Sequence, residues 1–253
     1  MSPSQVLDCP AGFATQVTLG PTTSGTAEEY ELVFARRALS KIKARLGLEA
    51  TERLLQPDID ESNAFWGQVL ADNCTNEFRP ARVELAINGL SMDEFLPWFR
   101  ERCQKRVPWM LAAQPEHWVV VSPAAAANAN TNADGGSSPG YHEKVIENLG
   151  PWISRFFITF SPPSHPCQLG DLNAEAYPLQ MTGYGHTDDG QINGYVLHQF
   201  RPHANSVGFD ANLCIYFPAS APEVLFEQHR QHLVVEFTNW ARHCYRDIKG
   251  KTS

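Results

Sequence analysis

The sequence contains no block of basic residues, no paired-cysteine motif and no long apolar run. Its 20 Lys and Arg residues are scattered among 28 Asp and Glu, and the formal charge of -8 does not favour a surface that follows a phosphate backbone. The six cysteines never show C-x-x-C spacing, so neither a zinc knuckle nor a dithiol redox motif is indicated. No apolar run has the length of a membrane span, and the first residues lack the regions of a signal peptide. We therefore expect a cytoplasmic protein that binds neither nucleic acid nor membranes.

The first part of the chain has the pattern of a helical region. Thr26 and Glu29 form a capping-box pattern, and apolar residues recur at helical spacing from there to Gly47. Two shorter helices, divided at Pro57, are expected to follow as far as residue 72.

The second part of the chain has the pattern of strands that lead to a long helix. Alternating polar and apolar side chains begin near Arg79, and several β-rich runs follow. A helix capped by Ser91 and Glu94 is expected over residues 92–103, and Pro97 inside it is expected to bend it or to shorten its first half. The last helix is expected from about Pro222 to Arg246. This order predicts an α+β fold in which a curved antiparallel sheet grips the final helix. We place an N-terminal helical region at residues 1–77 and the second domain at residues 78–253.

Residues 122–140 are small and polar, in the run SPAAAANANTNADGGSSPG. Such a segment cannot bury enough apolar surface to form its own core, so a mobile surface loop is expected. A loop of this length inside a domain can also cover a functional site, so a lid is the alternative.

The final helix carries one half of a candidate metal site. His232 and Glu236 are four residues apart, so their side chains share a helical face. Imidazole and carboxylate are both zinc ligands, and His117 and Glu147 upstream could supply the other half. A solvated i,i+4 pair is the alternative for the helical residues, and a hydrogen-bonded core histidine is the alternative for His117.

Two neighbouring residues compete for ligand roles. His229 precedes His232 by one helical turn, but its distance from Glu236 favours a place at the rim. Glu143 lies four residues before Glu147 and is the less favoured of the two carboxylates, because it precedes the motif IENLGP.

Three segments carry the candidate ligands: FLPWFRERCQKRVPWMLAAQPEHW, YHEKVIENLGPWISRFFITFSP and HLVVEFTNWAR. They resemble the metal-bearing segments of the 2,4-diacetylphloroglucinol and phloretin hydrolases, which are zinc-dependent. The resemblance extends over residues 78–246 and includes the order of the candidate ligands, with Glu147 following His117 by 30 residues. It implies a helix-grip domain of the START or Bet v 1-like type, with an N-terminal helical region that supports a homodimer. It also implies that His117, Glu147, His232 and Glu236 bind zinc.

The same resemblance points to residues that act on the substrate. His198 matches a histidine that faces the substrate, so we expect it to transfer a proton, with Glu147 or Glu236 assisting. A half-buried strand histidine is the alternative for His198, and His186 and His203 are further candidates for the proton donor.

Aromatic residues are the candidates for the walls of a substrate pocket. Trp109 stands where the family has a tyrosine that holds the substrate, and tryptophan cannot accept a hydrogen bond. Ordinary core packing is the alternative for all of these residues. The candidate substrate-binding set is Trp109, Trp118, Trp152 and Tyr195.

The resemblance therefore implies a zinc-dependent hydrolase that acts on carbon–carbon bonds in ketonic substances. Its expected substrate is a small aromatic or polyketide-like molecule of secondary metabolism, cleaved in a retro-Claisen reaction between an acyl group and a phenolic or β-diketone-like ring. One alternative is a metal-free helix-grip protein that binds or cyclises a polyketide-like ligand, as a carrier, cyclase or pericyclase. A second is a purely structural dimer.

Overall fold

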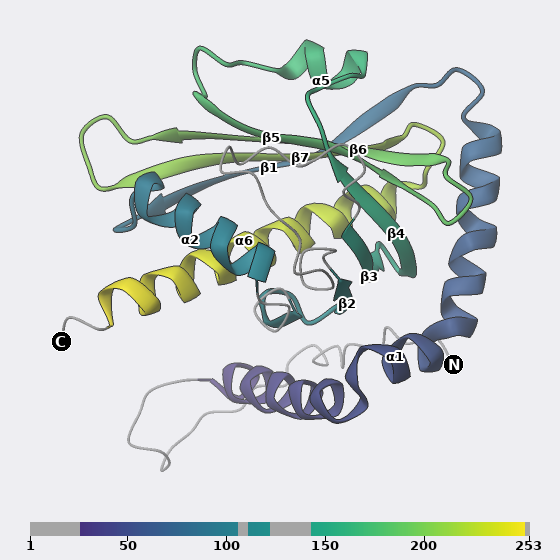
Figure 1. Cartoon of the computed structure of the whole chain (residues 1–253), viewed down its shortest axis with the longest axis horizontal. Coiled ribbons are helices and arrows are strands. Elements are labelled where there is room, and N and C mark those ends of the chain that lie inside the picture. The colour runs from purple at the N-terminus through teal and green to yellow at the C-terminus, as the bar shows by residue number, and fades with distance from the viewer. Residues whose placement is uncertain (1–25, 106–110, 122–142, 251–253) are drawn as a thin grey trace, which may run out of the picture. The chain divides into compact units, whose positions relative to one another are not determined.

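A single antiparallel sheet of seven strands organises the protein. The computed structural model describes residues 26–105, 111–121 and 143–250. Every neighbouring pair of strands is antiparallel, and the order across the sheet is β1-β7-β6-β5-β4-β3-β2 (Figure 1). The elements are α1 (Ala27–Asp72), β1 (Phe78–Asn88), α2 (Met92–Lys105), β2 (His117–Val121), β3 (Glu143–Leu149), β4 (Trp152–Phe160), α5 (Pro166–Asp171), β5 (Leu179–His186), β6 (Ile192–Pro202), β7 (Gly208–Pro218) and α6 (Glu223–Lys249).

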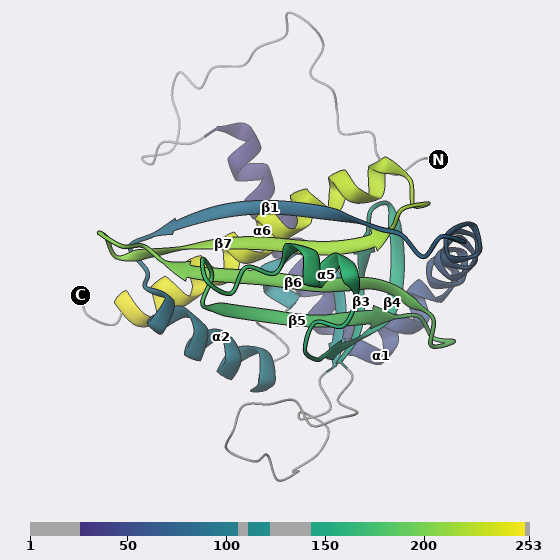
Figure 2. The ribbon, with the colours of Figure 1, turned by 90° about the horizontal axis from the view of Figure 1, so that it is seen from above.

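The long helix α6 crosses one face of the sheet, and the short helix α5 lies on the other (Figures 1 and 2). The first and last strands of the chain, β1 and β7, pair along their whole length. β1 is therefore one edge of the sheet, and the other strands follow from β7 in reverse chain order to β2 at the opposite edge. A long C-terminal helix held against such a sheet defines the helix-grip arrangement. The α+β fold class expected from the sequence is therefore confirmed.

Side chains on β6 show how the two faces differ. The ring of His198 contacts Phe237 of α6, and so does the ring of Phe200 two residues later. Tyr195, which alternates with them, contacts His165 next to α5. We call the two sides the α6 face and the α5 face. The α6 face carries the main hydrophobic core, to which α2 and α6 contribute.

Helix α1 begins at the expected cap and is broken at Gly47, where the first helix was expected to end. The Thr26 backbone N–H donates to Glu29 Oε2 (2.8 Å), and the Glu29 N–H donates to Thr26 Oγ1 (3.2 Å), so the capping box forms. Gly47 interrupts the helix with a φ of 69°, a left-handed conformation that favours glycine. The break expected at Pro57 is wrong, because the helix continues through it to Asp72.

The chain divides into two compact units within α1, Met1–Ala38 and Leu39–Ser253. The boundary expected after residue 77 differs from this division because the second half of α1 is part of the second unit. There, Trp66 is buried in the main core and its Nε1 donates to Ser154 Oγ of β4 at 3.0 Å. The hydrophobic core thus includes helical residues that the sequence pattern assigned to an appendage.

Helix α2 forms over its expected length in spite of its proline. The Ser91 N–H donates to Glu94 Oε2 (3.0 Å), and the Glu94 N–H donates to Ser91 Oγ (3.2 Å), which caps the first turn. The helix continues past Pro97 to Lys105, so the expected shortening does not occur.

The hairpin between β3 and β4 is held close to the start of α6. Gly150 in its turn has a φ of 62°, and a Cβ there would lie 2.9 Å from the Cα of Leu225. Only glycine allows both this conformation and this approach. The glycine therefore lets the end of β3 reach the helix that carries His232.

Two sequence predictions, Trp109 and the loop at residues 122–140, lie outside the described residues. Within the described ranges, no helix combines the length and the apolar composition that crossing a bilayer requires.

Candidate metal centre

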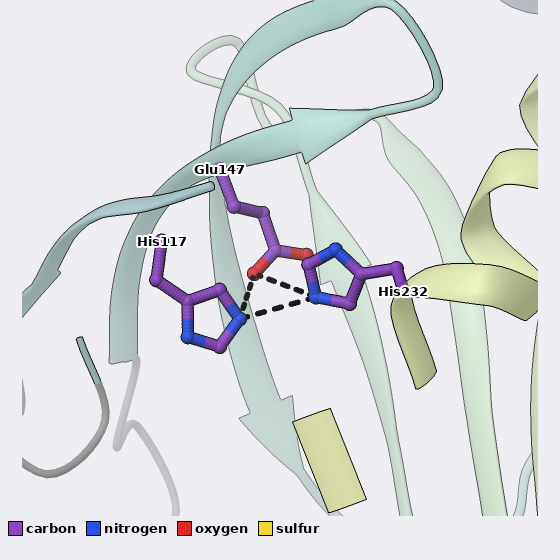
Figure 3. A group of neighbouring side chains, drawn as sticks. All are labelled: His117, Glu147 and His232. Atoms are coloured by element: carbon purple, nitrogen blue, oxygen red, sulfur yellow. Dashed lines mark hydrogen bonds and ion pairs between the residues drawn. The ribbon is translucent and has the colours of Figure 1, made fainter. Parts of the chain in front are cut away.

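Three elements bring together the four predicted ligands. His117 begins β2 and is the direct cross-strand partner of Glu147 on β3. His232 enters from α6, and its imidazole lies opposite the ring of His117 (Figure 3). Glu236 follows one helical turn later on α6 and also reaches His117. Residues separated by more than a hundred positions therefore meet at one point.

The Nε2 atom of His117 is the centre of the cluster. It lies 3.1 Å from His232 Nε2, 3.2 Å from Glu147 Oε2 and 3.3 Å from Glu236 Oε1. His232 Nε2 is 3.9 Å from the same Glu147 oxygen. Donor atoms of His117, Glu147 and His232 all lie within 4.8 Å of one another, whereas Glu236 is placed by its contact with His117.

Burial and charge act against each other in this cluster. Burial alone would lower the pKa of His117, but the hydrogen bonds and charges of Glu147 and Glu236 outweigh it and raise the pKa to about 10. Burial lowers the pKa of His232 to about 3, so this ring is neutral at physiological pH. Burial raises the pKa of Glu236, whereas the pKa of Glu147 is lowered because His232 and His117 outweigh the effect of its burial.

The spacing of the donor atoms is compatible with a bound divalent cation such as zinc. A ring nitrogen carries at most one hydrogen, which cannot point at three neighbours that all lie 3.1–3.3 Å from His117 Nε2. Zinc bonds of about 2.0–2.2 Å place tetrahedral ligand atoms roughly 3.3–3.6 Å apart, close to the spacing of these donors. A divalent cation would also neutralise two buried carboxylates, whose charges are costly to bury unpaired. His117, Glu147 and His232, with Glu236 as a fourth donor, could therefore hold zinc.

A β-bulge and hydrogen bonds from two side chains, those of Lys43 and Asn239, position the segment that carries His117. The pairing between β2 and β3 shifts between His117 and Val119, so Trp118 is an extra residue in the ladder. Lys43 of α1 donates from Nζ to the carbonyl oxygen of His117 (2.7 Å), and burial lowers its pKa to about 8. Asn239 of α6 donates to the carbonyl oxygen of Ala113 (2.6 Å). Sequence reasoning missed both residues, since nothing local links them to His117.

His198 is buried on the α6 face, as its predicted role requires. Its Nδ1 accepts a hydrogen bond from the backbone N–H of Cys214 (3.2 Å), so the proton of the neutral ring is on Nε2. Burial lowers the pKa of His198 to about 3. The ring can therefore donate a hydrogen bond at neutral pH, but it is not charged and is a poor proton donor.

Glu143 is a buried carboxyl on the same strand face as Glu147. The two side chains alternate with Lys144 and Ile146, and Val145 between them packs in the core that contains α6. Burial raises the pKa of Glu143 to about 7, the range in which a carboxyl can both give and take a proton. The structure does not bring it to His117 as a ligand. Glu143 and Glu147 are four residues apart in one strand, and this even spacing is the feature of the sequence that places both side chains on the same face.

His229 is buried, so its expected place at the rim is wrong. Its ring stacks on His232 with centroids 5.2 Å apart, and it meets Phe217 edge to face. Neither of its nitrogens has a hydrogen-bond partner among the residues that the structure describes, and both are shielded from solvent. His229 therefore packs behind His232 and does not join the donor atoms.

The other two histidine candidates belong to hydrogen-bonded turns. His203 Nε2 lies 2.9 Å from Asp210 Oδ1, and its Nδ1 lies 3.3 Å from Ser206 Oγ in the β6–β7 hairpin. His186 packs against Phe157 at the end of β5. Neither histidine is part of the cluster around His117.

The three described aromatic residues of the predicted pocket wall pack in three different surroundings. Trp118 packs in a small core formed with α1, because successive side chains of a strand point to opposite faces and its neighbour His117 points into the cluster. Trp152 stacks on Phe65 of α1, with ring centroids 3.7 Å apart. Tyr195 stacks on His165, on the α5 face. Strand periodicity in the sequence predicts that side chains alternate between the two faces of the sheet, but it does not predict which face carries the cluster around His117.

Fold and site together define a helix-grip α+β protein with a buried cluster of two imidazoles and two carboxylates. No family model matches the chain, and no curated protein matches its sequence. Among the solved structures that match is one titled "Crystal structure of Ara h 8.0201", which is 10% identical and has a TM-score of 0.42. The match covers 66% of this chain and 98% of that chain. This similarity carries no argument about a ligand or an activity, and the fold assignment rests on the strand order itself.

Proposed function

We propose that the protein is a zinc-dependent hydrolase that cleaves a carbon–carbon bond between an acyl group and a phenolic or β-diketone-like ring. The observation that carries this proposal is the position of His117 Nε2, with three donor atoms 3.1–3.3 Å away. The sequence resemblance that implies this activity also implies these four side chains as ligands. The activity itself rests on that resemblance, and the geometry supports the metal centre that it requires.

Zinc held by this cluster would supply Lewis acidity toward the acyl carbonyl and would lower the pKa of water to a value near neutrality. Two further requirements of the reaction must be met by side chains of the protein. The ring carbon that departs in a retro-Claisen cleavage must receive a proton, and an oxygen of the ring must be held while this happens.

His198 and Glu143 divide these two tasks in our proposal. The Nε2–H of His198 would donate a hydrogen bond to a substrate oxygen, because the neutral ring holds its proton there. Glu143 would supply the proton to carbon, since its burial keeps a proton available near neutral pH. This changes the role of His198 from proton donor to substrate holder.

A metal-free function is the second candidate, and one observation favours it. His117, with its raised pKa, can carry a proton that bonds to one carboxylate and attracts the other. Such a cluster could be a polar anchor for a polyketide-like ligand in a carrier or cyclase. The two candidates differ in their need for a metal.

Carboxylic acid release from acylphloroglucinols and related 1,3-diketones tests the proposed function. The hydrolase is expected to release the acid, to lose this activity after chelation and to regain it with zinc. Activity that survives complete chelation would instead support the metal-free candidate.

We also propose that the protein forms a homodimer through α1. This helix exposes Leu32, Ile42 and Leu46 among its described residues, and exposed apolar side chains grouped on one element are typical of an interaction surface. Light scattering is expected to give the mass of a dimer for the wild-type chain and of a monomer for an Ile42→Glu, Leu46→Glu variant. A monomeric wild-type chain would contradict the proposal.

A further inference from the structure

The backbone around His117 contains two carbonyl groups that point away from the sheet ladder and toward α1. The bulge at Trp118 removes this segment from regular pairing with β3. The carbonyl oxygens of Pro115 and His117, on either side of Glu116, are both bound by the ammonium group of Lys43, at 2.5 and 2.7 Å. A single side chain therefore satisfies both acceptors.

The surroundings of Lys43 restrict the position of its ammonium group. The Nζ atom lies 4.7 Å from the ring centroid of Trp118, in a cation–π contact, and the residue is partly buried. Its hydrogen bonds go to main-chain carbonyls, so they fix peptide planes and not the rotamer of another side chain. One of the two fixed peptide groups joins His117 to Trp118. Its orientation helps to set the direction in which the His117 side chain projects from the backbone.

We propose that Lys43 is a positioning residue of the metal centre, which acts by holding the His117 main chain so that Nε2 faces the other donors. The proposal rests on the zinc site proposed above and goes beyond it by assigning a role to a residue of α1. Metal ligands held in place by hydrogen bonds commonly lose 10–100-fold in metal affinity when those bonds are removed. Lys43 supplies this support through the backbone of the ligand.

The substitution Lys43→Met tests this role, because methionine keeps an apolar stem against Trp118 and removes the ammonium group that donates to the two carbonyl oxygens. Zinc affinity is measured by competition with a chelator, and the visible absorption spectrum of the cobalt-substituted protein reports the geometry of the ligands. We expect Lys43→Met to weaken zinc binding by about 10–100-fold and to alter the cobalt spectrum. Lys43→Arg should recover part of the affinity, since arginine can still donate to carbonyl groups.

Lys41→Met is the matched control, because Lys41 is exposed on the same helix. It should bind zinc as the wild-type chain does. The proposal is overturned if Lys43→Met and Lys41→Met show the same zinc affinity and the same cobalt spectrum. It is also overturned if Lys43→Met unfolds the metal-free protein, since the lysine would then be structural. A wild-type chain that binds no zinc overturns the metal centre together with this proposal, whereas a chain that binds zinc but hydrolyses nothing leaves the test of Lys43 intact.

Discussion

The two faces of the sheet each carry a polar cluster, and the clusters differ in how their charges are balanced. On the α5 face, Arg82 forms an ion pair with Asp171, whose carboxylate also accepts a hydrogen bond from Tyr216 Oη (2.6 Å). One positive group meets one negative group, and about a third of each charged side chain is exposed. The two charges of this cluster therefore balance each other without a ligand.

On the α6 face, two carboxylates and two imidazoles are buried together, and one nitrogen faces three donor atoms. The side chain of His117 is 2% exposed and that of Glu147 is 11% exposed, so water does little to screen them. Buried negative charge without a matching cation is costly in a cluster that only stabilises the fold. The comparison indicates that the α5 cluster fastens a helix to the sheet, and it supports our proposal that the α6 cluster holds a cation.

Replacement of a donor in the α6 cluster should have the largest effect. His232→Ala is expected to lower zinc affinity by more than about 100-fold, because it removes a ligand. The loss of a residue that only hydrogen-bonds to a ligand already lowers metal affinity by about 10–100-fold. Competition with a chelator measures this. Val234→Ala, at an exposed position on the same helix, is the control and should bind zinc normally. Equal zinc affinity of the two variants would mean that His232 is not a ligand.

Removal of the proposed proton donor should have the next largest effect. Glu143→Gln keeps the size of the side chain and removes its proton, so we expect kcat to fall by about 10²-fold or more, with zinc content unchanged. Single-turnover measurement of acid release separates this from an effect on product release. An unchanged kcat would assign the proton transfer to another group.

Disruption of the α5 cluster should change stability and not metal binding. Asp171→Asn removes the charge that pairs with Arg82, and we expect a loss of about 1 kcal/mol in the free energy of unfolding, because the pair is partly exposed. Denaturant unfolding of the metal-free protein measures it. Any parallel loss of zinc affinity would show that the two faces are coupled.

Removal of the Tyr195 hydroxyl should have the smallest effect. This residue lies on the α5 face, so Tyr195→Phe is expected to leave kcat/KM within about twofold of the wild-type value. A large change in KM would return Tyr195 to the substrate site and contradict its placement.

The sequence predicted which four side chains converge in the α6 cluster better than it predicted the surroundings of that cluster. His232 and Glu236 share a face because helix geometry is local, and the family resemblance brought His117 and Glu147 to the same point. The bulge between His117 and Val119, which places Val119 beside Ile146 in the core formed with α1, has no signature in the sequence. The fold class followed from the order of strands and the final helix.

Contacts across long distances in the sequence account for the other differences. Trp66 joins the main core from a helix that looked like an appendage, and Lys43 reaches the backbone of a residue more than seventy positions away. Both contacts depend on how α1 packs against the sheet, which helical periodicity alone does not specify. The role that we propose for Glu143 depends on its burial, which raises its pKa. The residues next to a charged side chain in the sequence do not predict whether it is buried.

The metal content of the purified protein tests the central claim most directly. Elemental analysis of the wild-type chain is expected to find about one zinc per chain, since the cluster offers one set of converging donors. His232→Ala should have lost it, and Asp171→Asn should have kept it. A wild-type chain without stoichiometric zinc, which also fails to take it up when zinc is added, would contradict the account.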